Sequence, residues 1–298
     1  MALIALAAFC WGASATLGKA VFNGMFAHAA PISPLVLAQT RTTFSFLILA
    51  PFLAVFARRH FRADRNSLLL ALVIGAIGLA GSNFFYYYAI AKTNVSTAIV
   101  LQYFAPVWVL LWMVVTRAQS ATLPRVFGVA LAVLGSALAI GIGAGAGFRV
   151  DKLGFLAAEG AGVCFAFYNV AGSRVVKHVS AIGVMLYAAL GAALLWSFID
   201  PPWRLARMPF SSGQWWFLVF FAAVSMLIPF VLYFLGLQRL DATSAIVTSC
   251  LEPVFAILLA AAFVGESLRP LQVLGIALVI GATALIQLPQ RRALGTHA

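Results

Sequence analysis

Charged side chains are scarce in this sequence, and acidic ones are the scarcest. Only 9% of the 298 residues are charged and only seven residues are Asp or Glu, whereas 64% are hydrophobic. One soluble core of a chain this long could not hide so many apolar side chains, so the composition excludes an ordinary soluble domain. We expect lipid to be the main solvent of this chain.

Cysteine and histidine are also few, and neither forms a metal-binding or catalytic pattern. Cys10, Cys164 and Cys250 lie inside apolar stretches without metal-ligand spacing, and the four histidines are scattered among loops and the tail. A membrane-embedded enzyme acting on lipid would need clustered His, Asp or Glu at the membrane edge, which disfavours that class. We expect no enzyme activity, no metal and no cofactor.

A nucleotide-binding loop is missing as well. Residues 141–146 fit the pattern GxGxxA, but they follow an apolar stretch and lack the strand before and the helix after that phosphate binding needs. They are better interpreted as part of a flexible link. ATP hydrolysis is therefore excluded as the driving force of any transport.

Long apolar stretches are what the sequence has instead. Each is long enough to cross a hydrocarbon layer of about 30 Å, and none shows the period-two alternation of barrel strands, so all are expected to be helices. The first has no basic leader and no cleavage site, which favours a spanning helix over a signal peptide. The ten stretches run near residues 3–21, 35–57, 68–91, 95–116, 123–143, 153–176, 182–199, 215–237, 242–264 and 271–288.

An internal repeat relates the two halves of the chain. Tyr86–Gly135 aligns without a gap with Tyr233–Ala282, an offset of 147 residues. Asn94 falls on Asp241, and both suit the N-cap of the helix that follows. Because each half has five helices, the second half must enter the membrane from the opposite face, so the repeat is inverted. We expect a first repeat over 1–143, a linker over 144–152, a second repeat over 153–288 and a tail over 289–298.

The basic residues indicate orientation. A net charge of +12 would suggest nucleic acid as the partner of a soluble protein, but here Lys and Arg occupy short loops between apolar segments. Even-numbered loops and the tail hold eleven of them, and odd-numbered loops hold seven. The bias depends strongly on the cluster at 58–65. It predicts that both termini lie in the cytoplasm and that the partners are lipid and a small molecule, with no nucleic acid.

Residues near both ends of the chain resemble those of a known family. Leu251-Glu252-Pro253-Val254, followed by Gly265-Glu266-Ser267 and Gly275, is similar to the end of an EamA domain, and Phe9-Cys10-Trp11-Gly12 is similar to the opening helix. The chain thus resembles the drug/metabolite transporter superfamily in its ten-helix form with two EamA domains. Its aromatic richness looks most like the bacterial aromatic amino acid exporters of the YddG type. The resemblance implies a bacterial cytoplasmic membrane protein, without a cofactor, whose central cavity opens alternately to each side.

Three charged residues lie well inside the expected spans, where an ionisable group should face protein or a water-filled path. Glu252 precedes Pro253 about half-way through its span. It is either a cavity carboxylate for a substrate ammonium or a proton, or a structural group that caps a broken helix or bonds a neighbouring helix. Arg41 and Glu159 lie at similar depth and could pair, either as a gate that breaks during transport or as a static ion pair.

Aromatic and amide side chains are the remaining candidates. Ring faces and a few fixed polar groups are what a cavity for a bulky zwitterion needs. Any single tyrosine could equally lie in the cavity or in the aromatic belt at the membrane interface. Three consecutive tyrosines cannot all face inward. The expected substrate-binding residues are Trp11, Ser14, Asn83, Tyr86, Tyr87, Gln102, Tyr103, Tyr168, Asn169 and Glu252.

These observations favour a secondary transporter that exports neutral amino acids, aromatic or bulky ones in particular, by alternating access. A drug or metabolite exporter of the same fold is the alternative. A strongly acidic cavity would favour a cationic cargo, and only Glu159 and Glu252 are available for that purpose.

Overall fold

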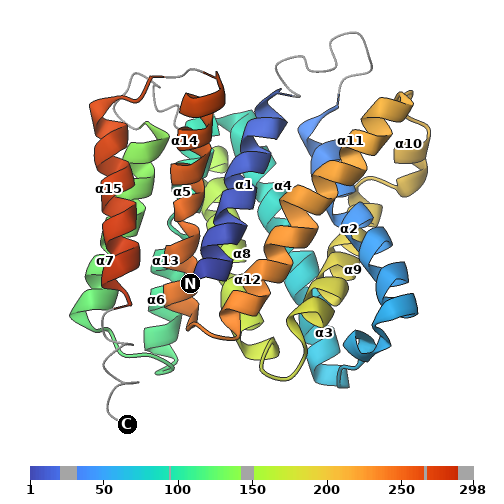
Figure 1. The fold of residues 1–298 in the computed structure, drawn as a ribbon, viewed down its shortest axis with the longest axis horizontal. Coiled ribbons are helices and arrows are strands. Elements are labelled where there is room, and N and C mark those ends of the chain that lie inside the picture. Colours follow the sequence, from blue (N-terminus) through green and yellow to red (C-terminus); the bar gives the residue numbers. More distant parts are fainter. Residues whose placement is uncertain (21–31, 94, 142–150, 265–266, 288–298) are drawn as a thin grey trace.

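The computed structural model describes residues 1–20, 32–93, 95–141, 151–264 and 267–287 (Figure 1). Within these ranges it contains helices and connecting loops but no strand. The expected all-α fold is therefore confirmed. The interdomain link and the tail expected at 144–152 and 289–298 lie almost wholly outside the described residues.

The helices follow the expected spans closely. In the first half they are α1 (Ala2–Ala20), α2 (Pro34–Phe56), η2 (Arg58–Phe61), α3 (Arg65–Val73), η3 (Ile74–Gly81), α4 (Ser82–Lys92), α5 (Val95–Gln102), α6 (Ala105–Val115) and α7 (Leu123–Ile140). In the second half they are α8 (Lys152–Val175), α9 (Ala181–Ile199), α10 (Pro202–Ala206), α11 (Ser212–Ala222), η4 (Ala223–Leu227), α12 (Ile228–Leu237), α13 (Ala242–Ser249), α14 (Leu251–Val264) and α15 (Pro270–Leu285).

Membrane-spanning length is reached by eight continuous or nearly continuous helical segments, each apolar enough to cross a bilayer. Two shorter apolar helices, Ala2–Gly18 and Pro270–Leu285, accompany them in the described chain. These ten segments correspond one to one with the ten expected stretches. The protein is a multi-pass membrane protein.

Four spans are interrupted half-way, which the sequence indicated only in part. The third and eighth spans contain the π-helical segments η3 and η4, and the fourth and ninth break between α5 and α6 and between α13 and α14. Proline near the start of α6 (Pro106) and of α14 (Pro253) lacks a backbone N–H and frees the carbonyl four residues earlier. The 147-residue offset places α13 on α5 and places η4 within η3, so the interruptions recur in both halves.

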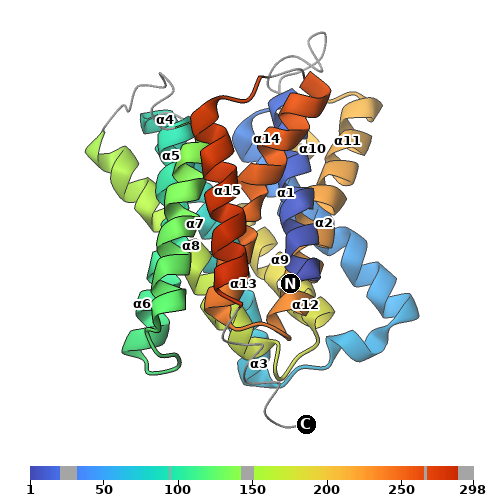
Figure 2. The ribbon, with the colours of Figure 1, turned by 60° about the vertical axis from the view of Figure 1, so that its left-hand side comes forward.

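The two halves exchange their first helices. Helix α1 packs on α12, α13 and α14 of the second half, whereas α8 packs on α4, α5 and α6 of the first half. Helix α2 packs on α9, and α7 packs along α15, at opposite ends of the molecule (Figures 1 and 2). Every one of these packing relations has a counterpart in the other half. This is the arrangement that an inverted repeat produces.

Small residues allow the closest of these helix crossings. A Cβ atom added to Gly135 of α7 would lie 2.8 Å from the Gly275 carbonyl oxygen of α15, and one added to Gly275 would lie 2.6 Å from the Gly135 oxygen. Such contacts are what membrane helices use in place of a hydrophobic driving force. At the end of α7, Gly141 has a φ of 102°, which glycine adopts without strain.

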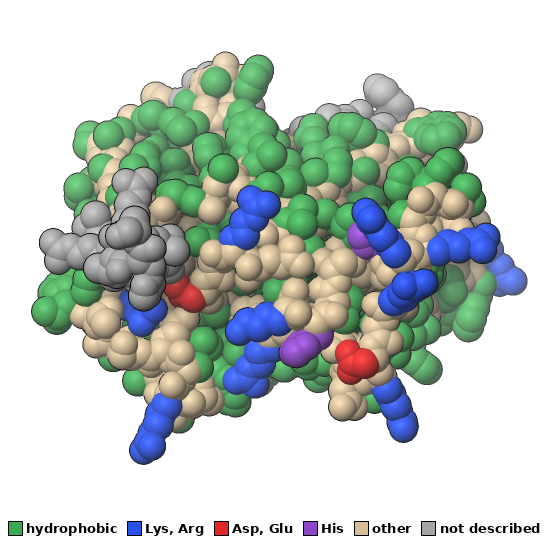
Figure 3. Space-filling model, turned by 60° about the horizontal axis from the view of Figure 1, so that its bottom comes forward, with side chains coloured by type: hydrophobic (Ala, Val, Ile, Leu, Met, Phe, Trp, Pro, Cys, Tyr) green, Lys and Arg blue, Asp and Glu red, His purple; other side chains and the backbone are tan. Residues whose placement is uncertain are grey.

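One end of the bundle carries the even-numbered loops. Lys and Arg side chains stand over this face, which is bordered by hydrophobic side chains (Figure 3). Here Gln119 of the first half donates to Asp241 at 2.9 Å and accepts from Thr243 at 2.6 Å, both in the second half. Asp241 is the expected N-cap of α13, accepting from the Ser244 N–H at 3.0 Å. The equivalent Asn94 lies outside the described residues.

Candidate functional site

The interruptions of the fourth and ninth spans bring Tyr103 and Glu252 together. Tyr103 lies between α5 and α6, and Glu252 lies in the first turn of α14, where the repeat pairs it with Ala105, two residues after Tyr103. The buried Tyr103 side chain lies close to the Glu252 carboxylate. Among the described residues, no backbone N–H of α14 caps this carboxylate. Glu252 therefore lies against the neighbouring half, and it remains partly accessible.

Arg41 of α2, in the second span, reaches toward the same region and is held there by the eighth span. Its Nη2 donates to the Ser225 carbonyl oxygen in η4 at 2.9 Å. That carbonyl lacks its normal helical donor because residue 229, four positions later, is a proline. The guanidinium also lies near Tyr87, 6.0 Å from the Phe221 ring centroid, and within electrostatic range of Glu252. The span-interrupting proline thus provides an anchor for this charge.

One face of α4 lies near the two charges. Asn83, Tyr86 and Tyr87 are spaced so that they share a helix face, and each side chain is partly accessible. Tyr86 is within electrostatic range of both Glu252 and Arg41. The Asn83 amide donates to the Leu79 carbonyl oxygen at 2.8 Å. This face therefore belongs to the same region as the two charges.

Gln102 supports this face from the end of α5. Its Nε2 donates to the Ser82 hydroxyl at 3.1 Å, and Ser82 in turn donates to the Ala161 carbonyl oxygen of α8 at 3.1 Å. The side chain therefore holds α5 against α4 and α8. It is partly accessible beside the break before Tyr103.

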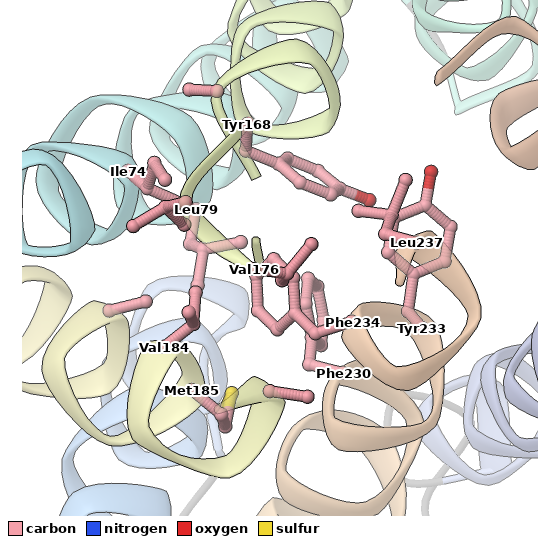
Figure 4. Packing of buried hydrophobic residues seen from close by; sticks show 14 of the residues in the cluster. Ile74, Leu79, Tyr168, Val176, Val184, Met185, Phe230, Tyr233, Phe234 and Leu237 are labelled. Atoms are coloured by element: carbon pink, nitrogen blue, oxygen red, sulfur yellow. The ribbon is translucent and has the colours of Figure 1, made fainter. Parts of the chain in front are cut away.

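Aromatic side chains from three helices form a packed wall next to these polar groups. The Trp11 ring lies 5.0 Å from Phe230 and 5.5 Å from Tyr233, measured between centroids. Tyr168 stacks on Phe165 at 4.9 Å and extends from α8 toward Tyr233 on α12 (Figure 4). Tyr168 is also within electrostatic range of Glu252. Because these rings fill one another's space, the wall is a packed boundary of the site and not an open pocket.

Two further candidates make hydrogen bonds to nearby groups. The Asn169 amide nitrogen donates to the Tyr233 hydroxyl within the wall, while its Oδ1 is buried without a partner. The Ser14 hydroxyl donates to the Trp11 carbonyl oxygen at 2.8 Å in its own helix. Both residues are buried next to the polar region.

Arg41 and Glu159 are not partners, which corrects the expected pairing. Glu159 accepts from the Trp108 indole nitrogen at 3.1 Å, and the Trp108 side chain is 39% exposed on the lipid-facing side of α6. Arg41 instead points inward between α2 and η4. Equal depth in the membrane had suggested the pair, but the two side chains leave their helices in different directions.

The third consecutive tyrosine, Tyr88, faces outward. It lines a groove of about 250 Å³ between α4 and α8 together with apolar side chains that are largely exposed. This groove has almost no polar lining and lies on the lipid-facing surface. It is distinct from the candidate site.

Sequence reasoning missed three contributors to the site. Ser225 supplies the carbonyl that anchors Arg41, Ser82 links Gln102 to α8, and Phe230 joins the aromatic wall. Only the first had a detectable signal, because a proline in the middle of a span marks a free carbonyl one turn earlier. The other two depend on helix packing that no single stretch encodes.

The site has ionisable groups beside broken helices in the middle of a membrane bundle, where two inverted halves meet. Such an arrangement is typical of one class of protein. This class is the multi-pass membrane transporters. The model of a family described as the EamA-like transporter family matches residues 1–141 and, a second time, residues 152–288. The chain belongs to the EamA-like transporter family.

Curated relatives span nearly the whole chain. The threonine/homoserine exporter RhtA of Escherichia coli is 28% identical over 290 residues, which cover 94% of this chain and 88% of the relative. The uncharacterized inner membrane transporter YicL of Salmonella typhimurium is 24% identical over 296 residues, which cover 97% and 95%. One solved crystal structure has the same fold, with a TM-score of 0.77, 21% identity and coverage of 98% of this chain and 97% of the other.

Proposed function

We propose that this protein is a secondary transporter that exports neutral amino acids across the bacterial cytoplasmic membrane by alternating access, with both termini in the cytoplasm. The observation that carries the proposal is the position of Arg41 and Glu252, two oppositely charged, partly accessible side chains held at interruptions of the membrane spans. Keeping such groups inside a membrane is costly unless they serve a substrate or a path through the protein. The similarity to an amino acid exporter supports the same conclusion.

Aromatic and other bulky amino acids are the finer part of the proposal. Tyr86 and Tyr87 offer ring faces to a substrate side chain between the two charges, and the wall around Trp11 could widen as the halves move. The relative that exports threonine and homoserine favours small hydroxylated substrates instead. A substrate panel must therefore contain both kinds.

A cationic drug is a less suitable cargo. Glu252 would attract it, but Arg41 is within electrostatic range of that carboxylate and would repel a second positive charge. The site as a whole suits a ligand with no net charge.

Counterflow in proteoliposomes tests the proposal. Vesicles containing the purified protein are loaded with unlabelled phenylalanine, tryptophan, threonine or homoserine and diluted into the same labelled amino acid. We expect transient accumulation of label with at least one of them, and none with lysine, aspartate or protein-free vesicles. Folded protein that exchanges no neutral amino acid would refute the function.

A further inference from the structure

Arg41 and Glu252 are the two ionisable side chains that the described spans direct into the interior; the third intramembrane charge, Glu159, bonds Trp108 at the periphery. Arg41 and Glu252 act on each other electrostatically but form no ion pair in the described structure. Since an ion pair needs its nitrogen and oxygen within 4.0 Å, the two groups are held apart. Tyr86 is within electrostatic range of both charges.

The Arg41 guanidinium retains unused hydrogen-bonding capacity. It has five N–H donors, of which the structure shows one in use, Nη2 to the Ser225 carbonyl oxygen. Its Nε is buried and has no hydrogen-bond partner. A planar guanidinium with spare donors, held through one terminal nitrogen by a backbone carbonyl, is suited to a carboxylate.

The Glu252 carboxylate also retains unused capacity. It can accept about four hydrogen bonds, and the neighbouring Tyr103 hydroxyl can supply one of them. Because no backbone N–H caps it within the described part of α14, its remaining lone pairs are available to a ligand cation. An ammonium group offers three donors and the matching charge.

We propose that Arg41 and Glu252 bind the two ends of one zwitterion, with Arg41 receiving the substrate carboxylate and Glu252 the substrate ammonium. The inference rests on the proposed amino acid transport and specifies its recognition. An α-amino acid carries both charged groups on adjacent positions, so it can bridge two side chains that are too far apart to pair. The described interior offers no third charge, so the substrate side chain is neutral.

Competition against counterflow of labelled L-phenylalanine or L-threonine tests this assignment. The competitors are the unlabelled amino acid, its amide, which lacks the carboxylate charge, and its N-acetyl derivative, which lacks the ammonium. For the wild-type protein we expect both derivatives to compete at least about tenfold more weakly than the amino acid.

Substitutions of Arg41 and Glu252 test separately the recognition of the substrate carboxylate and of the substrate ammonium. Arg41→Gln should weaken the amino acid at least about tenfold and leave the amide nearly unchanged, so that their ratio approaches one. Glu252→Gln should remove discrimination against the N-acetyl derivative in the same way. Glu159→Gln is the matched control and should keep all wild-type ratios.

If the variants bind the amino acid but do not exchange it, ligand-induced shifts of the melting temperature give the relative affinities for the amino acid and its derivatives. If Arg41→Gln does not fold, Arg41→Lys keeps the charge but not the fork and should reduce the ratio several-fold. Equal weakening of amino acid and amide by the Arg41 variant would overturn the assignment while leaving amino acid transport intact. Absence of any neutral amino acid exchange by the wild type would overturn the function itself, and the assignment with it.

Discussion

Arg41 and Glu252 each depend on single neighbouring polar groups for their position. The Tyr103 hydroxyl lies beside Glu252 and can donate to its carboxylate, and the Ser225 carbonyl is the acceptor that orients Arg41. A bond to a charged group in a poorly solvated site is worth about 1.5–3 kcal/mol, more than a typical neutral one. Loss of a single atom here should therefore be measurable.

Tyr103→Phe removes that donor and keeps the ring. We expect the apparent affinity for the transported amino acid to fall by about 3- to 10-fold, because the carboxylate loses a partner that holds it in position. Affinity is measured by counterflow at varied substrate concentration. Tyr88→Phe deletes the same atom on the outward groove and should change nothing. Equal effects of both substitutions would show that the Tyr103 hydroxyl has no special role.

At the scale of helices, the sequence predicted where the spans lie but not how they are interrupted. Apolar length alone locates each crossing to within a few residues. The prolines at 106 and 253 indicated a disturbance in the fourth and ninth spans. In the eighth span Pro229 follows η4 closely and was a further signal, whereas η3 in the third span contains no proline.

The sequence also did not predict which way each side chain points from its helix. Arg41 and Glu159 have similar depth, yet one faces η4 and the other faces Trp108. Likewise, Tyr86 and Tyr87 share the inner face of α4 while Tyr88 lines the outer groove. Depth follows from position along a helix, but facing requires knowledge of the neighbouring helices.

The crossing of α7 and α15 gives a prediction at this scale. Gly135→Ala places a methyl group 2.8 Å from the Gly275 oxygen and 2.9 Å from the Leu278 Cβ, so the helices must move apart. We expect a loss of about 1–3 kcal/mol, seen as a lower melting temperature in detergent. Gly281→Ala, on α15 with nothing within 4 Å of the added atom, is the control and should not destabilise. A Gly135 variant as stable as this control would contradict the close packing.

At the scale of the whole molecule, the inverted repeat determines which loops share a face. The even-numbered loops meet at the charged end of the bundle, where Gln119 joins the halves through Asp241 (Figure 3). The 147-residue offset in the sequence predicted this relation, and the recurrent helix interruptions accompany it. The sequence did not predict the contacts of Gln119 with Asp241 and Thr243, because they depend on how the two halves pack.

Orientation is testable with single cysteines in a background lacking the three native ones. Cysteines at Ser120 and Ser180, both in even-numbered loops, should be protected from an impermeant thiol reagent added to intact cells. A cysteine at Ser211, in an odd-numbered loop, should react. The basic loops are expected to remain inside because of the positive-inside rule. The opposite labelling pattern would reverse the orientation.

The central claim is that one mid-membrane site between the halves opens alternately to each side and holds a neutral amino acid. The most direct measurement is the reactivity of Asn83→Cys, beside Tyr86 and Tyr87, toward a small impermeant thiol reagent in right-side-out and inside-out vesicles. We expect labelling from both sides, slowed in both by the transported amino acid and at least about tenfold less effectively by its amide. Labelling from one side only, or labelling that the amino acid does not slow, would contradict it.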